Sequence, residues 1–315
     1  MEIVSSENKP KKNKKVSYGK WGVIFLIPFF VVYTLFTLVP QLMTIGFSFF
    51  EYFKISVTKY SGPKFVGFDN YINLFTPNYA GDIAILKYFC NTMIIWLIGA
   101  LPQFVIALLL ALIFTSTRLK IRFQGFFKSV FYMPNLIMAS AFALLFFQLF
   151  GESGPINKMI IQNGGEMIRF LSIKISTRSL IAFMNFLMWF GNTTILLMAG
   201  IQGIDESLFE SARMDGASSF KVFKDITLPL LKPILIYVTI TSLIGGIQMF
   251  DVPQILTNGK GTPDNTSTTI VMLLNNYLGT RKNYGMAGAV SVILFLITGA
   301  LSLIVYKTMA KGEED

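Results

Sequence analysis

The chain has 315 residues, of which 53% are hydrophobic and only 14% are charged, and its formal net charge is +10. A soluble domain of this size carries about a quarter charged residues, so the composition indicates that lipid is the main solvent and argues against an ordinary cytosolic enzyme. The absence of His and the single Cys exclude His-based acid–base catalysis, Cys/His metal sites and an intrachain disulfide, and we expect no metal site.

Six windows of the chain are apolar and long enough to cross a bilayer as helices, which takes about 20 residues each. The first contains Pro28 and Pro40 and is longer than one crossing requires, so we expect a single kinked or tilted span with an emerging end. The pattern predicts an all-α, polytopic membrane protein with six transmembrane helices and one membrane domain over residues 21–308. The windows lie at residues 21–50, 91–114, 129–150, 180–202, 230–252 and 284–306.

Basic residues predict the orientation of these helices. The N-tail, residues 1–20, holds six lysines beside the first window, where the positive-inside rule is most reliable. We therefore expect the N-tail, the C-tail (residues 309–315) and the connections 115–129 and 203–233 on the cytoplasmic side of the cell membrane. The positive charge is then explained by basic residues that orient the membrane helices, and we expect no nucleic-acid partner. Outer loops and short surface helices are expected at residues 51–86, 151–179 and 253–283.

The centres of the six windows contain no Asp, Glu, Lys or Arg. Transporters driven by protons or sodium usually keep ionisable groups in mid-membrane, because such groups are costly there and persist for function. The chain also lacks a phosphate-binding loop, since Gly259-Lys260-Gly261 is too short for one and lies on the predicted outer side. If the chain moves a solute actively, another polypeptide must supply the energy.

The connection between the fourth and fifth windows shows clear helix signals. Asp205 can cap a helix, and Ser207 with Glu210 offers a competing capping box. Gly216 can end this helix in the left-handed conformation, and Ser219 can begin a second amphipathic helix. The pair is too short to span a membrane, so it is expected either to lie on the bilayer surface or to dock on a partner protein.

The residues of this connection favour the partner protein. Their types and spacing resemble the E-A-A…G…I-x-L-P loop of permease subunits in binding-protein-dependent ABC importers, with Ser in place of the second motif residue. The resemblance implies the type I ABC importer permease fold and makes this loop a coupling helix that lies in a groove of a cytoplasmic ATPase. The residues implied for ATPase coupling are Glu210, Ser211, Ala212, Arg213, Asp215, Gly216, Ile226, Leu228 and Pro229.

Two further segments resemble the sugar-permease branch of that family, the maltose and multiple-sugar type. Phe250-Asp251 followed by Leu256-Thr257-Asn258-Gly259 is similar to the F-D…L-T-x-G-G-P segment, although the G-G-P is here broken into residues 259–263. Residues 65–71 are similar to the F-V-G-L-x-N-Y element. The resemblance implies a second homologous permease, an extracytoplasmic sugar-binding protein and two copies of a cytoplasmic ABC ATPase. ATP and Mg would bind to the ATPase, so no cofactor is expected in this chain.

A sugar site in a membrane needs amides or alcohols that match hydroxyl groups, together with aromatic faces. Asn185, Trp189 and Asn192 are spaced to share one face of the fourth helix. Several residue types differ from the maltose-type relative, notably Gly246 and Met249, where that relative has amides. Close packing between helices is an alternative role for each polar or small residue. The resemblance and the helical spacing together predict sugar contacts at Asn185, Met188, Trp189, Asn192, Ser242, Gly246, Gln248 and Met249.

The leading hypothesis is therefore a permease subunit that forms half of a pathway for a carbohydrate, expected to be an oligosaccharide, and that couples to a separate ATPase. A stand-alone facilitator or channel is the alternative, but it leaves the loop from Glu210 to Pro229 unexplained. A polytopic membrane enzyme would need a cluster of His, Cys or carboxylates at one membrane face, and the sequence contains no such cluster.

Overall fold

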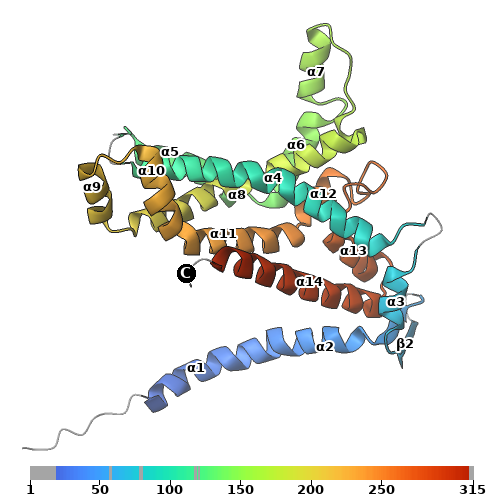
Figure 1. Cartoon of the computed structure of the whole chain (residues 1–315). Coiled ribbons are helices and arrows are strands. Elements are labelled where there is room, and N and C mark those ends of the chain that lie inside the picture. The colour runs from blue at the N-terminus through green and yellow to red at the C-terminus, as the bar shows by residue number, and fades with distance from the viewer. Residues whose placement is uncertain (1–18, 57–58, 78–80, 117–118, 120, 312–315) are drawn as a thin grey trace, which may run out of the picture.

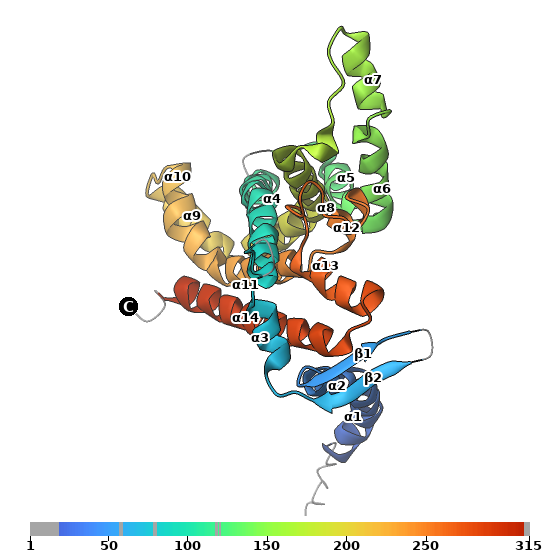
Figure 2. The ribbon, with the colours of Figure 1, turned by 90° about the vertical axis from the view of Figure 1, so that its right-hand side faces the viewer.

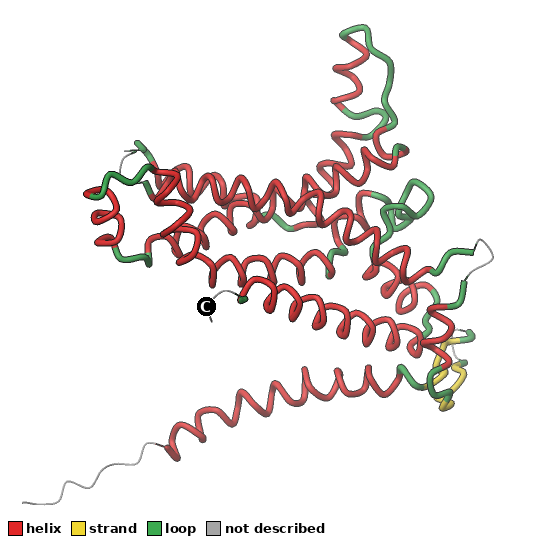
Figure 3. The backbone as a smooth tube through the Cα atoms, in the orientation of Figure 1, coloured by secondary structure: helices red, strands yellow, loops and turns green. Residues whose placement is uncertain are grey.

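The computed structural model describes residues 19–311, except 57–58, 78–80, 117–118 and 120. The chain is helical over most of this length (Figure 1, Figure 3). Within the described residues, five helices are long and apolar enough to cross a bilayer, and a bent helix pair makes a sixth span if it is counted as one. The predicted all-α polytopic class is confirmed. Residues 1–18 of the predicted basic N-tail lie outside the described residues.

The elements follow one another in a simple order along the chain. They are α1 (Gly19–Tyr33), η1 (Thr34–Leu38), α2 (Val39–Phe47), β1 (Phe50–Lys54), β2 (Tyr60–Phe65), α3 (Asp69–Phe75), α4 (Ala84–Thr115), α5 (Gln124–Leu136), α6 (Ala139–Phe150), α7 (Pro155–Gln162), η2 (Phe170–Ser172), α8 (Lys174–Gln202), α9 (Glu206–Met214), α10 (Ser219–Val222), η3 (Phe223–Thr227), α11 (Leu228–Ile247), α12 (Asp251–Leu256), α13 (Ile270–Asn275), η4 (Asn276–Thr280) and α14 (Tyr284–Ala310).

The two ends of the helical bundle carry different elements. Figure 1 places α9, α10, the beginning of α1 and the end of α14 at one end, which we call the α9 end. The opposite end holds the β1–β2 hairpin with α3 and α13, and we call it the hairpin end (Figure 1, Figure 2). Both termini of the described chain therefore lie at the α9 end, as an even number of crossings requires.

The first span is a single helix whose expected kink is replaced by a widened turn. Residues 34–38 are π-helical, and the N–H of Val39 donates to the carbonyl of Thr34. Pro40 has no N–H with which to continue the ordinary helical bonding, and a π-turn directly before it accommodates the missing bond. The helix ends at Phe47, and the chain emerges into strand β1.

The third window differs most from the prediction of one continuous span. Helices α5 and α6 meet at a bend of 90°, because Ile137 and Met138 between them have extended backbone angles. Pro134 removes a helical hydrogen bond just before the break, and the Asn135 side chain instead donates to the carbonyl of Met188 at 3.0 Å. As a result α6 packs against α8 and α12, with Phe142, Ala143 and Phe146 in the buried core, and α7 projects away from the bundle (Figure 1).

Small residues sit where the membrane helices cross. A Cβ atom at Gly99 of α4 would lie 2.8 Å from the carbonyl oxygen of Ala182 in α8, and one at Gly191 of α8 would lie 2.0 Å from that of Phe131 in α5. Glycine permits these backbones to approach closely, which is how helices associate in lipid. These crossings hold α4 and α5 against α8, the central helix of the bundle.

The hairpin end contains a feature that the sequence pattern did not predict. Residues 51–86 were expected to form loops and short helices, yet β1 and β2 pair antiparallel with Phe50 opposite Phe65. Asn70 of α3 is buried and donates to the carbonyls of Ser48 and Phe50, at 2.9 and 3.0 Å. These two bonds fix α3 at the base of the hairpin.

The loop between α12 and α13, which contains the broken G-G-P segment, is held by a buried polar network. Arg178 of α8 is 9% exposed and donates through Nε to the carbonyl of Thr266 at 2.9 Å and through its terminal nitrogen to Asn91 Oδ1. Asn91 of α4 donates in turn to the carbonyls of Asn265 and Thr268, at 2.9 and 3.2 Å. The altered loop is thus tied to both α4 and α8.

Candidate functional site

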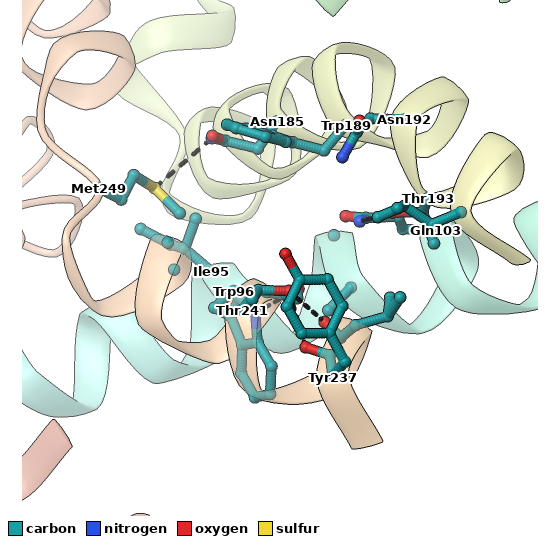
Figure 4. A pocket seen from close by; sticks show the side chains of 17 residues that line it. Ile95, Trp96, Gln103, Asn185, Trp189, Asn192, Thr193, Tyr237, Thr241 and Met249 are labelled. Atoms are coloured by element: carbon teal, nitrogen blue, oxygen red, sulfur yellow. Dashed lines mark hydrogen bonds between the residues drawn. The ribbon is translucent and has the colours of Figure 1, made fainter. Parts of the chain in front are cut away.

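A cavity of about 220 Å³ opens between α4, α8 and α11. Figure 4 shows Asn185, Trp189 and Asn192 of α8 on one side, facing Trp96, Tyr237 and Thr241 on the other. All of the 17 side chains and glycines that line the cavity are uncharged. Six of the eight residues predicted to contact sugar are among them, namely Asn185, Trp189, Asn192, Ser242, Gly246 and Met249.

The α8 wall of the cavity presents polar groups that are open to a ligand. Trp189 is 48% exposed, and within the described part of the chain neither its indole N–H nor the amide of Asn192 has a protein hydrogen-bond partner. Asn185 is already engaged, since its amide donates to the carbonyl of Ile181 at 2.8 Å and to Met249 Sδ at 3.5 Å. Trp189 and Asn192 are therefore the α8 residues best placed to bind a solute.

Two predicted residues lie outside the cavity. Met188 is buried among core side chains, because successive residues of a helix are rotated by about 100° and the position next to Trp189 faces the packed core. Gln248 caps the end of α11 and is exposed away from the lining. The structure therefore does not bring these two side chains into the cavity with the other six.

The structure adds polar and aromatic residues from other helices to the site. Trp96 and Gln103 come from α4, and the buried Gln103 side chain donates to Thr193 Oγ1 at 2.9 Å. Tyr237 and Thr241 line the cavity one turn apart on α11. The four-residue spacing from 237 through 241 to 245 was a signal that could have found these two, whereas nothing local in the sequence marks Trp96.

A second candidate site lies at the α9 end, in the 203–233 connection. Asp205 caps α9, accepting a hydrogen bond from the N–H of Ser207 at 3.0 Å, so the first of the two capping alternatives is the one present. This bond lowers the pKa of the Asp205 carboxyl. The cap therefore stays ionised at neutral pH and weakens only as the pH falls below the ordinary carboxyl range.

Helix α9 ends in a glycine motif that reverses the chain. Gly216 has a φ of +73°, and the N–H groups of Gly216 and Ala217 donate to the carbonyls of Arg213 and Ala212, at 3.0 and 2.9 Å. This paired arrangement is the Schellman cap, in which only glycine adopts the left-handed conformation without strain. The predicted left-handed end at Gly216 is confirmed.

The second helix of the connection begins at Ser219 as expected, capped by the Ser218 side chain. It does not stop before Pro229. Instead α10 continues through a π-turn at residues 223–227 into α11, because the wider turn accommodates the proline that cannot donate a hydrogen bond. The second helix of this connection is therefore continuous with the helix that carries Tyr237 and Thr241.

The residues predicted to couple to an ATPase are mostly on the surface of this connection. Ala212 and Ile226 are half-buried, and the other seven are exposed. The apolar underside of the pair, which includes Phe209, Val222 and Phe223, lines a cavity of about 470 Å³ beside the ends of α4 and α8. The carboxylates of Glu210 and Asp215 are both exposed on the outer surface of the connection.

Comparison with known proteins places these features in a family context. The family described as "Binding-protein-dependent transport system inner membrane component" matches residues 87–311. The lactose transport system permease protein LacF of Rhizobium radiobacter is 28% identical over 93% of this chain and 95% of its own length. The multiple sugar-binding transport system permease protein MsmF of Streptococcus mutans is 29% identical over 95% of this chain and 99% of its own.

Two further comparisons concern another relative and the fold. The trehalose/maltose transport system permease protein MalF of Thermococcus litoralis is 28% identical over 96% of this chain and 97% of its own length. A solved structure of a bacterial ABC transporter involved in the import of the acidic polysaccharide alginate matches with a TM-score of 0.77 and 20% identity, covering 94% of this chain and 98% of that chain. At this identity the likeness shows the fold alone.

Proposed function

The chain belongs to the family of binding-protein-dependent transport system inner membrane components, and from this premise we propose that it forms half of the transmembrane pathway for a neutral oligosaccharide. It is a multi-pass permease component of an ABC importer and not itself an ATPase. The finer proposal concerns the solute, the partners and the coupling route, each of which rests on a separate feature of the molecule.

The uncharged cavity is the observation that carries the proposal about the solute. Amide, hydroxyl and indole groups converge there, and no ionised side chain is among its lining residues. Such a lining suits the hydroxyls and C–H faces of a neutral sugar, whereas an acidic sugar would be desolvated without a counter-charge. The names of the relatives support a sugar, since they refer to lactose, multiple sugars and trehalose/maltose.

The open side of the cavity supports a second, homologous permease as the partner within the membrane. Trp189 and Tyr237, which carry an indole N–H and a hydroxyl, line the cavity and are 48% and 55% exposed. A pathway between two permeases would cover the cavity from the open side and complete the site. The cavity of about 220 Å³ would then be only half of the space that an oligosaccharide occupies.

The 203–233 connection supports coupling to two copies of a cytoplasmic ABC ATPase, which would bind ATP and Mg, with no cofactor in this chain. Glu210 and Asp215 offer carboxylates to basic groups of such a partner, and α10 continues into the cavity-lining helix α11. With this connection and both termini in the cytoplasm, the hairpin end faces outward, where an extracytoplasmic binding protein would deliver the sugar.

Reconstitution in liposomes tests this function directly. The chain assembled with its second permease and ATPase, and supplied with the binding protein, is expected to take up at least one of lactose, maltose and trehalose in an ATP-dependent manner. A size-matched disaccharide with a uronic acid is expected to be excluded. Uptake by this chain without an ATPase would support a stand-alone facilitator or channel and would overturn the proposal.

Substitutions in the α8 wall test the position of the site. Trp189→Ala and Asn192→Ala each remove a group open to the solute, and each is expected to raise the KM for uptake about tenfold, in line with about 1–3 kcal/mol for an unsatisfied buried hydroxyl. Ile195→Ala, on the same helix but outside the cavity lining, is the matched control. Unchanged uptake in both site variants would show that the sugar passes elsewhere.

A further inference from the structure

Trp96 enters the cavity from α4 and lies against α11. Its indole N–H donates to Ser242 Oγ at 3.2 Å, and the side chain is half-buried. Because the N–H is already bonded to α11, Trp96 offers a solute its ring rather than a hydrogen-bond donor. Trp189 on the opposite wall differs, since its N–H has no partner within the described residues.

Gly246 makes this placement of Trp96 possible. A Cβ atom at position 246 would lie 2.1 Å from Trp96 Cδ1 and 2.5 Å from Cγ, so any larger residue would occupy the place that the indole fills. Ser242 and Gly246 are one helical turn apart on α11. Ser242 Oγ accepts the hydrogen bond from the indole N–H, and the missing side chain at Gly246 leaves room for the Cδ1 and Cγ atoms of the five-membered ring. Because glycine has no side chain, the indole from α4 fills the space that a side chain of α11 would otherwise occupy.

We propose that Trp96 is a specificity-determining residue whose indole packs against the C–H face of the transported sugar, and that Ser242 and Gly246 are positioning residues that hold this ring. The inference rests on the proposed function, because it requires the cavity to carry a sugar. The ring face supplies apolar contact area while the opposite wall, with Trp189 and Asn192, supplies hydrogen bonds to the hydroxyl groups (Figure 4).

Substitution of Trp96 tests the ring contact. With the sugar that the wild-type complex takes up from lactose, maltose and trehalose, Trp96→Leu is expected to raise the KM about tenfold. Trp96→Phe, which keeps an aromatic ring, is expected to raise it about threefold or less. Leu97→Ala, at the adjacent position outside the cavity, is the control, and its KM and its ATP hydrolysis without sugar should match the wild-type values.

A double-substitution cycle tests the positioning role. Ser242→Ala and Gly246→Ala should each raise the KM when Trp96 is present, and neither should raise it further in the Trp96→Leu background. KM effects that multiply in the double variants would mean that Ser242 contacts the sugar independently, and would overturn the positioning role. An unchanged KM in Trp96→Leu would overturn the stacking role.

These outcomes are separable from failure of the proposed function. A wild-type complex that takes up none of the three sugars would overturn the function and the present inference together. A wild-type complex that transports sugar, with Trp96→Leu folded and unaltered in KM, would overturn the inference alone. Size-exclusion chromatography of each complex, together with its sugar-independent ATP hydrolysis, establishes that a raised KM does not come from loss of folded protein.

Discussion

Replacing Gly216 with proline is expected to lower sugar uptake at least tenfold while leaving the permease folded. The residue has a φ of +73°, which proline cannot adopt. Its N–H donates to the carbonyl of Arg213, and proline has no N–H with which to make this bond. The Schellman cap would open, and the chain would leave α9 in another direction. Since α10 continues into α11, the surface proposed to dock on the ATPase would lose its fixed relation to the cavity.

The readouts for this variant are ATP-dependent uptake and stimulation of ATP hydrolysis by the sugar-loaded binding protein. Gly203→Ala is the matched control, because Gly203 begins the same connection with a φ of −79°, which alanine adopts freely. Gly216→Ala should fall between the two, since the left-handed conformation costs a non-glycine residue about 1–2 kcal/mol. Full coupling in Gly216→Pro would remove the 203–233 connection from the mechanism.

Replacing Gly191 with alanine is expected to have a large effect on stability. Its Cβ atom would lie 2.0 Å from the backbone oxygen of Phe131, which no side-chain rotation relieves, so α5 and α8 must separate. Overpacking of this kind costs about 1–3 kcal/mol. Gly191 also lies between Trp189 and Asn192, so the separation would displace the cavity wall. We expect a lower melting temperature in detergent and reduced uptake.

Gly299→Ala is the control for this variant. Gly299 is exposed on α14, and a Cβ atom there would have no heavy atom within 4 Å apart from its own helix. Its melting temperature should match that of the wild-type protein. If the melting temperature of Gly191→Ala also matched that of the wild-type protein, α5 and α8 could not approach each other as closely as the structure has them.

The helical repeat accounts for how much of the candidate site could be predicted from the sequence. Residues spaced three or four apart share a helix face, and this rule alone places Asn185, Trp189 and Asn192 on one wall. The same rule explains why Met188 and Gln248 lie outside the cavity, since each is adjacent in the sequence to a lining residue but occupies a different face of its helix. Trp96 was missed because its partner Ser242 is 146 residues away, and spacing along one helix carries no information about another helix.

The amino-acid sequence by itself determined the solvent, the class and the family of this protein. The length of the apolar windows specifies the membrane helices, and local backbone chemistry specifies the Gly216 turn and a helix start near Asp205, so these could be predicted in order along the chain. Only the tertiary structure decided that α5 and α6 meet at 90°, that residues 50–65 pair as a hairpin, and that Gly246 makes room for Trp96. Each of these depends on which backbone or side chain lies opposite, and that is settled by packing between segments far apart in the sequence.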